Sequence, residues 1–146
     1  AFKKHNLTLG CVESFTGGLF ASEITKVPGA SSFFKGAVVT YATEEKASVL
    51  GIPYSLINEY GVVSKQIAEQ MAVKGKELLN VDYCVSFTGN AGPSAMENKP
   101  VGEIYIGVAY QKNVIVNGYH LSGSRDEIRA QALTEAYKIL ESLLKQ

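Results

Sequence analysis

The feature that most constrains the fold is a short apolar run that passes directly into two glycines and a helical pattern. Residues 7–13 read LTLGCVE and predict a strand. Ser14 follows at the corner, and Gly17 and Gly18 lie in the next turn. Apolar residues then recur at the spacing of one helical face: Phe20, Ile24 and Val27. The segment therefore predicts a strand, a tight turn and a helix that begins near Thr16.

Further β-rich segments follow this first helix. Residues 34–41 (FKGAVVTY) predict a second strand. Residues from 81 onward (VDYCVSF) predict a third, which runs into a loop rich in Gly, Pro, Asn and Ser. Residues 102–121 contain two more β-rich runs on either side of residues 111–113, which is typical of a hairpin.

Helical patterns separate these strands. Residues 43–51 predict a short helix capped by Thr43, and residues 52–64 predict an irregular stretch or a single turn. Ser64 caps a longer helix with an apolar stripe of Ile67, Met71, Leu78 and Leu79. Residues 124–127 form a capping box before the last helix. The apolar stripe of that helix consists of Ile128, Ala132, Leu133, Ala136, Tyr137, Leu140 and Leu144.

The resulting order is β α β α α β β β α. It predicts an α/β fold, a three-layer α/β/α sandwich with a mixed, partly antiparallel sheet. No repeat or linker interrupts the chain, so we expect one domain over residues 1–146. The chain does not begin with Met, which leaves open that it is a fragment of a longer, two-domain protein.

Composition narrows the classes of partner. The chain is 46% hydrophobic and 19% charged, which indicates a soluble globular protein. Its 14 basic and 14 acidic residues balance, so neither nucleic acid nor a membrane is an expected partner. Cys11 and Cys84 lie in apolar strands without metal-ligand spacing, and we interpret them as inert thiols of a cytoplasmic protein. We expect no metal and no cofactor.

Side chains that could take part in catalysis or binding follow three predicted strands. Ser14 follows the first strand, Tyr41 ends the second, and Thr88 with Gly89 ends the third. Ligands of open α/β sheets gather at such carboxyl ends. Lys46 lies about one helical turn beyond Tyr41, so its side chain can return toward the same rim.

A serine hydroxyl needs a base to become a nucleophile. His5 and His120 are not near a predicted strand end, which disfavours a Ser-His-Asp arrangement. A lysine with a lowered pKa can serve instead, so Lys46 is the candidate base, with Tyr41 as a relay or an orienting group. The alternative interpretation of Ser14 is a helix N-cap.

Two further groups could bind an anion. The backbone amides of Thr16, Gly17 and Gly18 would be unpaired at a helix start, where they could stabilise an oxyanion or bind a phosphate. Arg129, in the first turns of the last helix, could face solvent or reach an anion. Each of these residues is ambiguous when it is taken alone.

Taken together, six ordered motifs carry a resemblance that covers almost the whole chain. The motifs are VESFTGG, KGAVVTYATEEKASVLGI, GVVS, SFTGNAGP, KPVGEIYIGVA and SRDEIRAQA. In this order and spacing they resemble the CinA C-terminal domain family, the nicotinamide-nucleotide amidases. The resemblance implies deamidation of nicotinamide mononucleotide, a pyridine nucleotide, to nicotinate mononucleotide and ammonia, without a metal or other cofactor.

The resemblance also implies roles for individual residues. The implied catalytic residues are Ser14, Tyr41 and Lys46. With the amides considered above, the implied substrate-binding set is Thr16, Gly17, Gly18, Thr88, Gly89 and Arg129. Arg129, alone or together with Arg125, could pair with the substrate phosphate. Members of the family tend to self-associate, and the domain occurs alone or fused behind another domain. We therefore expect a homo-oligomer, with a fused N-terminal domain as an option.

Two positions depart from the family pattern. Position 15 is Phe, where the family usually has a smaller residue, and residues 94–99 replace a glycine-rich run. Ser94, Ala95 and Met96 tolerate positive φ less well than glycines do. The alternative function is therefore an inactive pyridine-nucleotide-binding or regulatory module, or an α/β scaffold attached to a larger protein.

Overall fold

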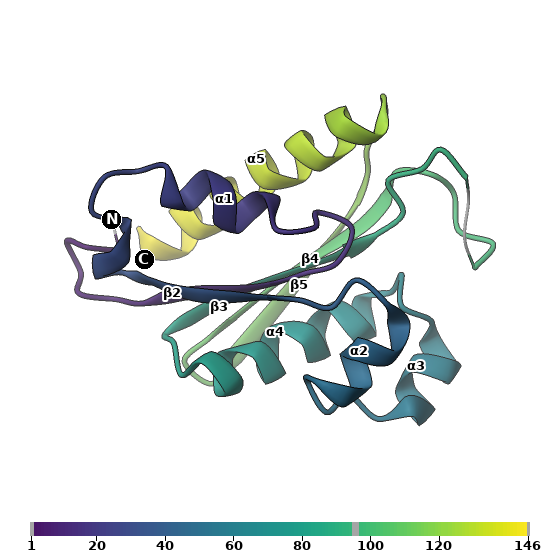
Figure 1. Cartoon of the computed structure of the whole chain (residues 1–146), viewed down its shortest axis with the longest axis horizontal. Helices are drawn as coiled ribbons and strands as arrows, with labels where there is room; N and C mark the ends of the chain where they lie inside the picture. The colour runs from purple at the N-terminus through teal and green to yellow at the C-terminus, as the bar shows by residue number, and fades with distance from the viewer. Residues whose placement is uncertain (1, 95–96, 146) are drawn as a thin grey trace.

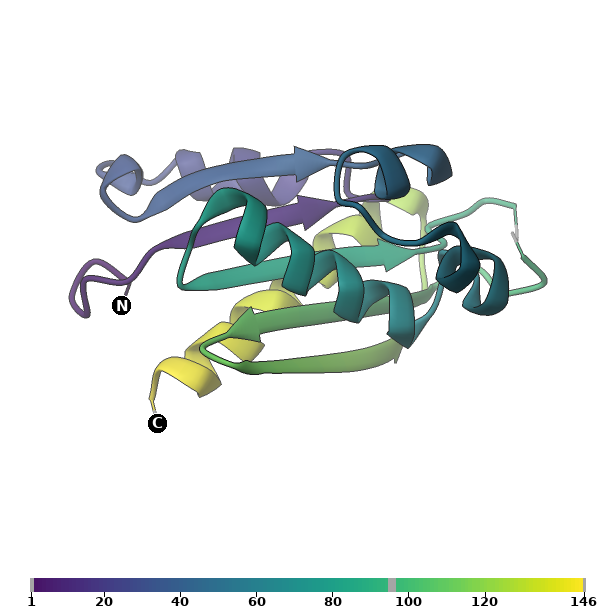
Figure 2. The ribbon, with the colours of Figure 1, turned by 90° about the horizontal axis from the view of Figure 1, so that it is seen from below.

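The computed structural model describes residues 2–94 and 97–145, and five strands form one sheet at its centre (Figure 1). The strands are β1 (Leu9–Glu13), β2 (Phe34–Val39), β3 (Tyr83–Gly89), β4 (Glu103–Tyr110) and β5 (Asn113–His120). Their spatial order is β2-β1-β3-β4-β5 (Figure 2). β1 pairs in parallel with β2 and β3, whereas β3, β4 and β5 are antiparallel. The predicted mixed sheet is confirmed. Ala95 and Met96, singled out above, lie outside the described residues.

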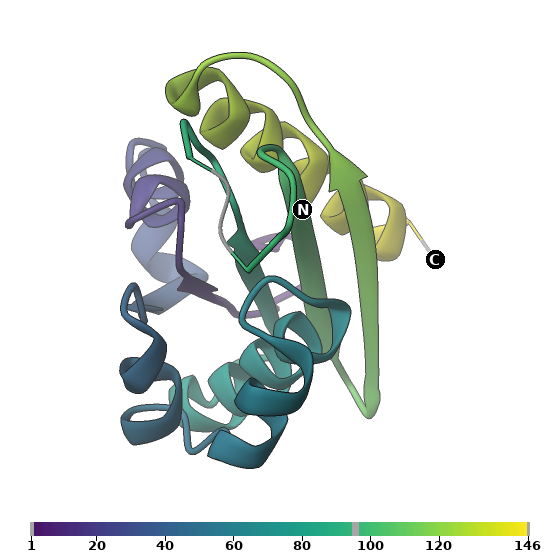
Figure 3. The same ribbon diagram turned by 90° about the vertical axis from the view of Figure 1, so that its right-hand side faces the viewer.

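Helices cover both faces of the sheet, which completes the predicted three layers (Figures 1 and 3). One face carries α1 (Leu19–Thr25) and α5 (Arg125–Leu144), and the other carries α2 (Thr43–Ser48), α3 (Tyr54–Tyr60) and α4 (Lys65–Leu79). A short 3-10 turn, η1 (Ala30–Ser32), precedes β2. In the described part of the chain, no helix combines the length and apolar character that membrane crossing requires.

The sheet separates two apolar cores. Phe20, Phe87 and Ile128 belong to the core beneath α1 and α5, whereas Ile67 and Met71 of α4 belong to the other. The two cysteines are divided between these cores, and both are fully buried. Burial raises the pKa of each thiol, so both remain protonated and unreactive near neutral pH.

The first helix is shorter than predicted at both ends. It begins at Leu19 rather than near Thr16, because Gly17 and Gly18 adopt φ values of 58° and 102° and continue the turn. It ends at Thr25, so Val27 lies beyond it and is 53% exposed rather than on a buried face.

The other helix predictions were confirmed in type, with three corrections. Ser64 and Ser124 cap α4 and α5 as expected, through side-chain bonds to the third amide of each helix. Thr43 is the first residue of α2 rather than its cap. Residues 54–60 form a regular helix instead of a single turn, since Pro53 fixes its entry and Ile57 is buried. Leu78, predicted in the buried stripe of α4, is 54% exposed.

A buried carboxylate joins the end of β1 to the start of α1. Glu13 is fully buried, and its Oε1 accepts hydrogen bonds from the amides of Gly18 (3.2 Å) and Phe20 (3.0 Å). Its Oε2 accepts from the amide of Ala21 at 3.1 Å and from the Cys11 thiol at 3.5 Å. These amides belong to the positive end of the helix, so the charge is favourably placed. Glu13 therefore closes residues 14–18 into one fixed turn.

Substitution of this carboxylate tests its structural role. Glu13→Gln replaces an acceptor oxygen with an amide NH₂ that faces backbone N–H donors, so we expect a loss of about 2–3 kcal/mol in the free energy of unfolding. Urea denaturation measures this loss. Glu23→Gln, on the helix that Glu13 caps, is the control, because Glu23 forms a surface ion pair with Lys26 and should change stability by less than about 0.5 kcal/mol. Equal midpoints for the two variants would contradict the assignment.

Candidate active site

The topology of the sheet brings two strand ends together. From β1 the chain passes to β2 on one side, and β3 later pairs on the other side of β1. Such a point of reversal leaves a crevice at the carboxyl ends of the strands. A pocket of about 140 Å³ lies there, and its lining includes Ser14, Phe15, Tyr41, Lys46, Thr88 and Arg125. Three predicted catalytic residues thus line one pocket.

Ser14 and Lys46 are in direct contact. The amide of Ser14 donates to the carbonyl of Phe87 at 3.1 Å, which fixes the serine beside β3. Lys46 Nζ donates to Ser14 Oγ at 3.2 Å and to the carbonyl oxygen of Thr40 at 2.7 Å. The lysine comes from α2 and is only 1% exposed. Ser14 is 9% exposed, so both groups are largely shielded from water.

The environment of Lys46 favours its neutral form. Burial lowers the pKa of its ammonium group from 10.5 to about 8, and the negative charge of Glu97 opposes this shift. At neutral pH a minor fraction of the amine is therefore unprotonated, and the lone pair of that fraction can accept the proton of an adjacent hydroxyl. The pair has the arrangement of a nucleophile with its own base.

Tyr41 does not lie between Ser14 and Lys46, where a proton relay would have to stand. Those two residues meet without an intermediary, and Tyr41 is 62% exposed at the mouth of the pocket. Its hydroxyl accepts a hydrogen bond of 3.1 Å from Nη2 of Arg125. Nη1 of Arg125 donates to the carbonyl of Gly92. Tyr41 therefore orients a cation at the rim of the pocket.

The predicted oxyanion donors are only partly available. The amide of Gly17 donates to the carbonyl of Ser14 at 3.0 Å, and the amide of Gly18 is bound by the Glu13 carboxylate. By contrast, the amides of Phe15 and Thr16 have no hydrogen-bond partner in the described part of the chain. Phe15 lines the pocket, whereas Thr16 is fully buried and does not line it, so the donor left for a ligand is the amide directly after the serine rather than those of the glycines.

Thr88 and Gly89 shape the floor of the pocket. Thr88 donates its hydroxyl proton to the carbonyl oxygen of Val62 at 2.6 Å. Gly89 allows β4 to approach, since a Cβ there would lie 2.2 Å from a methyl carbon of Ile104. Both residues also line the pocket, so a ligand in it would touch them.

Glu97 supports the opposite wall of the pocket. Its carboxylate accepts hydrogen bonds from the amides of Val62 (2.9 Å) and Val63 (3.0 Å), and Lys99 Nζ donates to the carbonyl of Val63 at 2.8 Å. Val62 lines the pocket, so Glu97 and Lys99 hold that wall from behind. Both residues belong to the segment 94–99 that replaces a glycine-rich run.

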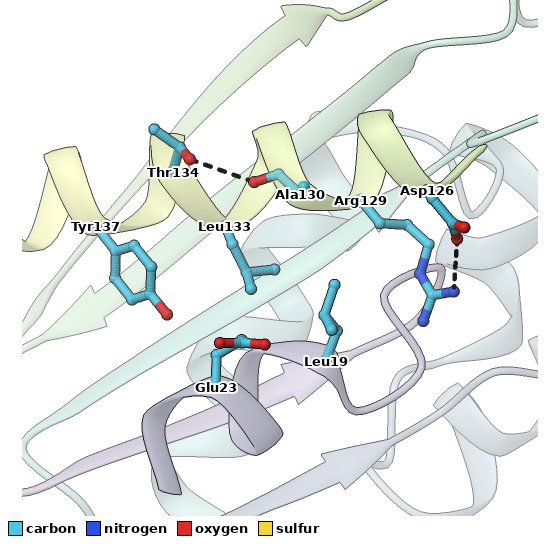
Figure 4. A pocket seen from close by; sticks show the side chains of 8 residues that line it. All are labelled: Leu19, Glu23, Asp126, Arg129, Ala130, Leu133, Thr134 and Tyr137. Atoms are coloured by element: carbon cyan, nitrogen blue, oxygen red, sulfur yellow. Dashed lines mark hydrogen bonds and ion pairs between the residues drawn. The ribbon is translucent and has the colours of Figure 1, made fainter. Parts of the chain in front are cut away.

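Arg129 does not line this pocket. Its Nη2 donates to the carbonyl of Thr16 at 2.8 Å, and its side chain lines a separate hollow between α1 and α5 (Figure 4). The arginine that reaches the Ser14 pocket is Arg125, four residues earlier. Of the two arginines considered for phosphate binding, the structure thus places Arg125 at this pocket and Arg129, the first choice from the sequence, one helical turn away from it.

Three residues of this region carried no prediction: Glu13, Glu97 and Asn90, which is 3% exposed and lines the pocket. A buried acid directly before the serine was a visible signal for Glu13. Glu97 gave none, since its partner Val62 lies 35 residues away. Across residues 2–94 and 97–145, no three His, Cys, Asp or Glu side chains are placed to hold a metal ion.

Several known proteins have sequences similar to that of this chain. The family model of the CinA C-terminal domain matches residues 1–144. A competence-damage inducible protein from Bacillus cereus is 42% identical over 97% of this chain, and the alignment covers 35% of that protein. A protein of the same name from Bacillus thuringiensis gives the same values. The chain thus spans about a third of the length of the curated relatives it matches.

Solved structures agree with the fold. The competence/damage inducible protein CihA from Agrobacterium tumefaciens is 31% identical and superposes with a TM-score of 0.93 over 97% of this chain and 88% of its own. A CinA superfamily protein from Escherichia coli is 25% identical, with a TM-score of 0.94 over 97% of this chain and 83% of its own. By sequence and by fold, the chain belongs to the CinA C-terminal domain family.

Proposed function

We propose that this chain is an amidase that hydrolyses the carboxamide of nicotinamide mononucleotide to nicotinate mononucleotide and ammonia. The observation that carries the proposal is the contact of 3.2 Å between Lys46 Nζ and Ser14 Oγ in a shielded pocket. Resemblance to the nicotinamide-nucleotide amidases supplies the substrate. A buried serine with a partly neutral lysine fits the needs of amide hydrolysis, because an amide is a weak electrophile with a poor leaving group.

The first half of the reaction forms an acyl-enzyme. Ser14 Oγ attacks the carboxamide carbon while Lys46 Nζ takes the hydroxyl proton. The amide of Phe15, which lines the pocket, donates to the oxygen that becomes negative. The C–N bond then breaks, and the lysine ammonium group protonates the departing nitrogen to give ammonia. The carbonyl of Thr40, 2.7 Å from Nζ, holds the amine in place throughout.

The second half returns the enzyme to its starting state. Lys46, neutral again, accepts a proton from a water molecule as that water attacks the ester carbon. The tetrahedral intermediate collapses, Ser14 recovers its proton from the lysine, and the carboxylate product leaves. The amide of Phe15 serves both tetrahedral intermediates.

The size of the pocket and its rim suggest how a nucleotide would bind. A volume of about 140 Å³ is below the ~300–1,000 Å³ of pockets that enclose whole ligands. It suits a ring with its carboxamide, and the ribose phosphate would extend past the rim. Arg125 stands at that rim with a planar guanidinium, the group best suited to pair with a phosphate.

Removal of the nucleophile tests the proposal directly. Ser14→Ala should reduce ammonia release from nicotinamide mononucleotide by at least about a thousandfold, since no other hydroxyl contacts Lys46 among the described residues. A coupled glutamate dehydrogenase assay measures the ammonia. Ser22→Ala, on the exposed side of α1, is the matched control and should keep full activity. Nucleotide binding by the unmodified chain without ammonia release would instead favour the inactive module.

The rate should depend on pH through Lys46. The base acts in its neutral form, and its pKa is about 8, so kcat/KM should rise with pH and level off above that value. Glu97→Gln removes the charge that raises this pKa, so the rising limb should move to lower pH. Rate profiles from about pH 6 to about pH 10 check both statements. A rate that falls with pH over this range would contradict a neutral lysine base.

The rim arginine should distinguish the nucleotide from its nucleoside. Arg125→Gln removes a charged donor pair, so KM for nicotinamide mononucleotide should rise by about ten- to a hundredfold. KM for nicotinamide riboside, which lacks the phosphate, should change little. Steady-state kinetics with both substrates provides the comparison. An equal rise for both would show that Arg125 supports the pocket without binding the phosphate.

A further inference from the structure

A second cavity lies between α1 and α5 (Figure 4). Its volume is about 430 Å³, within the ~300–1,000 Å³ typical of small-molecule sites. We call it the α1–α5 hollow; its lining includes the apolar side chains of Leu19 and Leu133, the carboxylates of Glu23 and Asp126, and the side chains of Arg129 and Tyr137. It shares no lining residue with the Ser14 pocket among the described residues, and the reaction proposed above makes no use of it.

The middle of the hollow is apolar. Leu19 from α1 and Leu133 from α5 point toward one another across it, and the ring of Tyr137 lies beside them (Figure 4). Tyr137 is 37% exposed although its ring packs against Phe20 at 5.5 Å between centroids. Apolar surface that remains open to water between two helices gains free energy when an apolar body covers it.

One end of the hollow carries a cation that lacks a close acidic partner. Nη2 of Arg129 is bound to the carbonyl of Thr16, but Nη1 is 3.9 Å from the carboxylate of Asp126, which is 95% exposed. An exposed pair at that distance contributes little. Nε of Arg129 is buried and has no hydrogen-bond partner in the described part of the chain, so the N–H groups that an anion could reach are those of Nη1 and Nη2. The guanidinium therefore retains donors and charge for an anion.

The other end offers neutral or compensated groups. The carboxylate of Glu23 is paired with Lys26 at 2.9 Å. Burial, with the charge of Glu23, raises the pKa of the Tyr137 phenol, so this group remains a protonated donor. Arg129 and Tyr137 stand about two helical turns apart on α5, or about 12 Å along the helix. The hollow thus has a cationic end, an apolar middle and a hydrogen-bonding end.

We propose that the α1–α5 hollow is a second ligand site, which takes a small amphipathic anion with its acidic group on Arg129 and its apolar body between Leu19 and Leu133. The Arg129 guanidinium selects the acid, since Glu23 is paired with Lys26 and the carboxylate of Asp126 is 95% exposed. The two leucines select an aromatic or branched aliphatic body. The site is independent of the amidase proposal, and its test requires no turnover.

Two probes of nearly equal shape test the site. Anilinonaphthalene sulfonate has an aromatic body with one sulfonate, and phenylnaphthylamine has the same body without charge. Fluorescence titration of the full chain should show saturable binding of one anionic probe per chain. Arg129→Gln should weaken the anionic probe by about tenfold or more and leave the neutral probe nearly unchanged. Lys138→Gln, which removes an exposed charge on the same helix outside the hollow, is the matched control.

A third variant locates the bound probe. Ala130 is exposed at the edge of the hollow, so Ala130→Phe should fill the cavity without disturbing the core and should abolish binding of both probes. Thermal unfolding of each variant checks that the fold is intact. Three results would overturn the proposal: no saturable binding, binding that survives Ala130→Phe, or an equal loss of both probes in a folded Arg129→Gln protein.

Discussion

The buried carboxylate of Glu13 is the interaction on which the geometry of the candidate site depends. It accepts three amides from the start of α1, and it thereby joins a central strand to a surface helix across five to eight residues of sequence. The turn between them contains Ser14 and the amides of Phe15 and Thr16. Since Glu13 binds the amide of Gly18 and the Ser14 carbonyl binds that of Gly17, the amide of Phe15, next to the serine, is the donor that remains on the pocket side. Glu13 takes part in no proposed chemical step, but its hydrogen bonds determine which amide near Ser14 remains available to a ligand.

Lys46 shows a second consequence of burial. An isolated ammonium group in an apolar interior is unfavourable, so the side chain must either find acceptors or lose its proton. Here it does both in part: the carbonyl of Thr40 and the hydroxyl of Ser14 accept from Nζ, and the pKa still falls to about 8. More acceptors or a nearer carboxylate would raise the pKa of Lys46, and the charged amine could not accept a proton. Glu97 is placed to raise the pKa without cancelling the effect of burial.

The sequence was informative where short-range rules apply, and less so where distant segments meet. The caps Ser64 and Ser124, the hairpin and the order of elements along the chain follow from local patterns, and six motifs sufficed for the family. The start of α1 was placed too early because positive φ at Gly17 and Gly18 cannot be distinguished from helix in a periodic pattern. Helical spacing alone does not say which turn of α5 faces the pocket, so its two arginines could not be told apart. Glu97 could not be predicted, because only tertiary structure brings it to the peptide it binds.

The peptide of Val62 is held from two directions, by Glu97 at its N–H and by Thr88 at its carbonyl. Because both backbone groups of Val62 are hydrogen-bonded, this wall of the pocket resists the movement that a larger ligand would require. A substituent added to a bound ligand on the Val62 side would meet this fixed wall. A substituent added toward the open rim at Tyr41 would extend into solvent. The two hydrogen bonds of Val62 therefore determine on which side of the pocket a larger ligand can be accommodated.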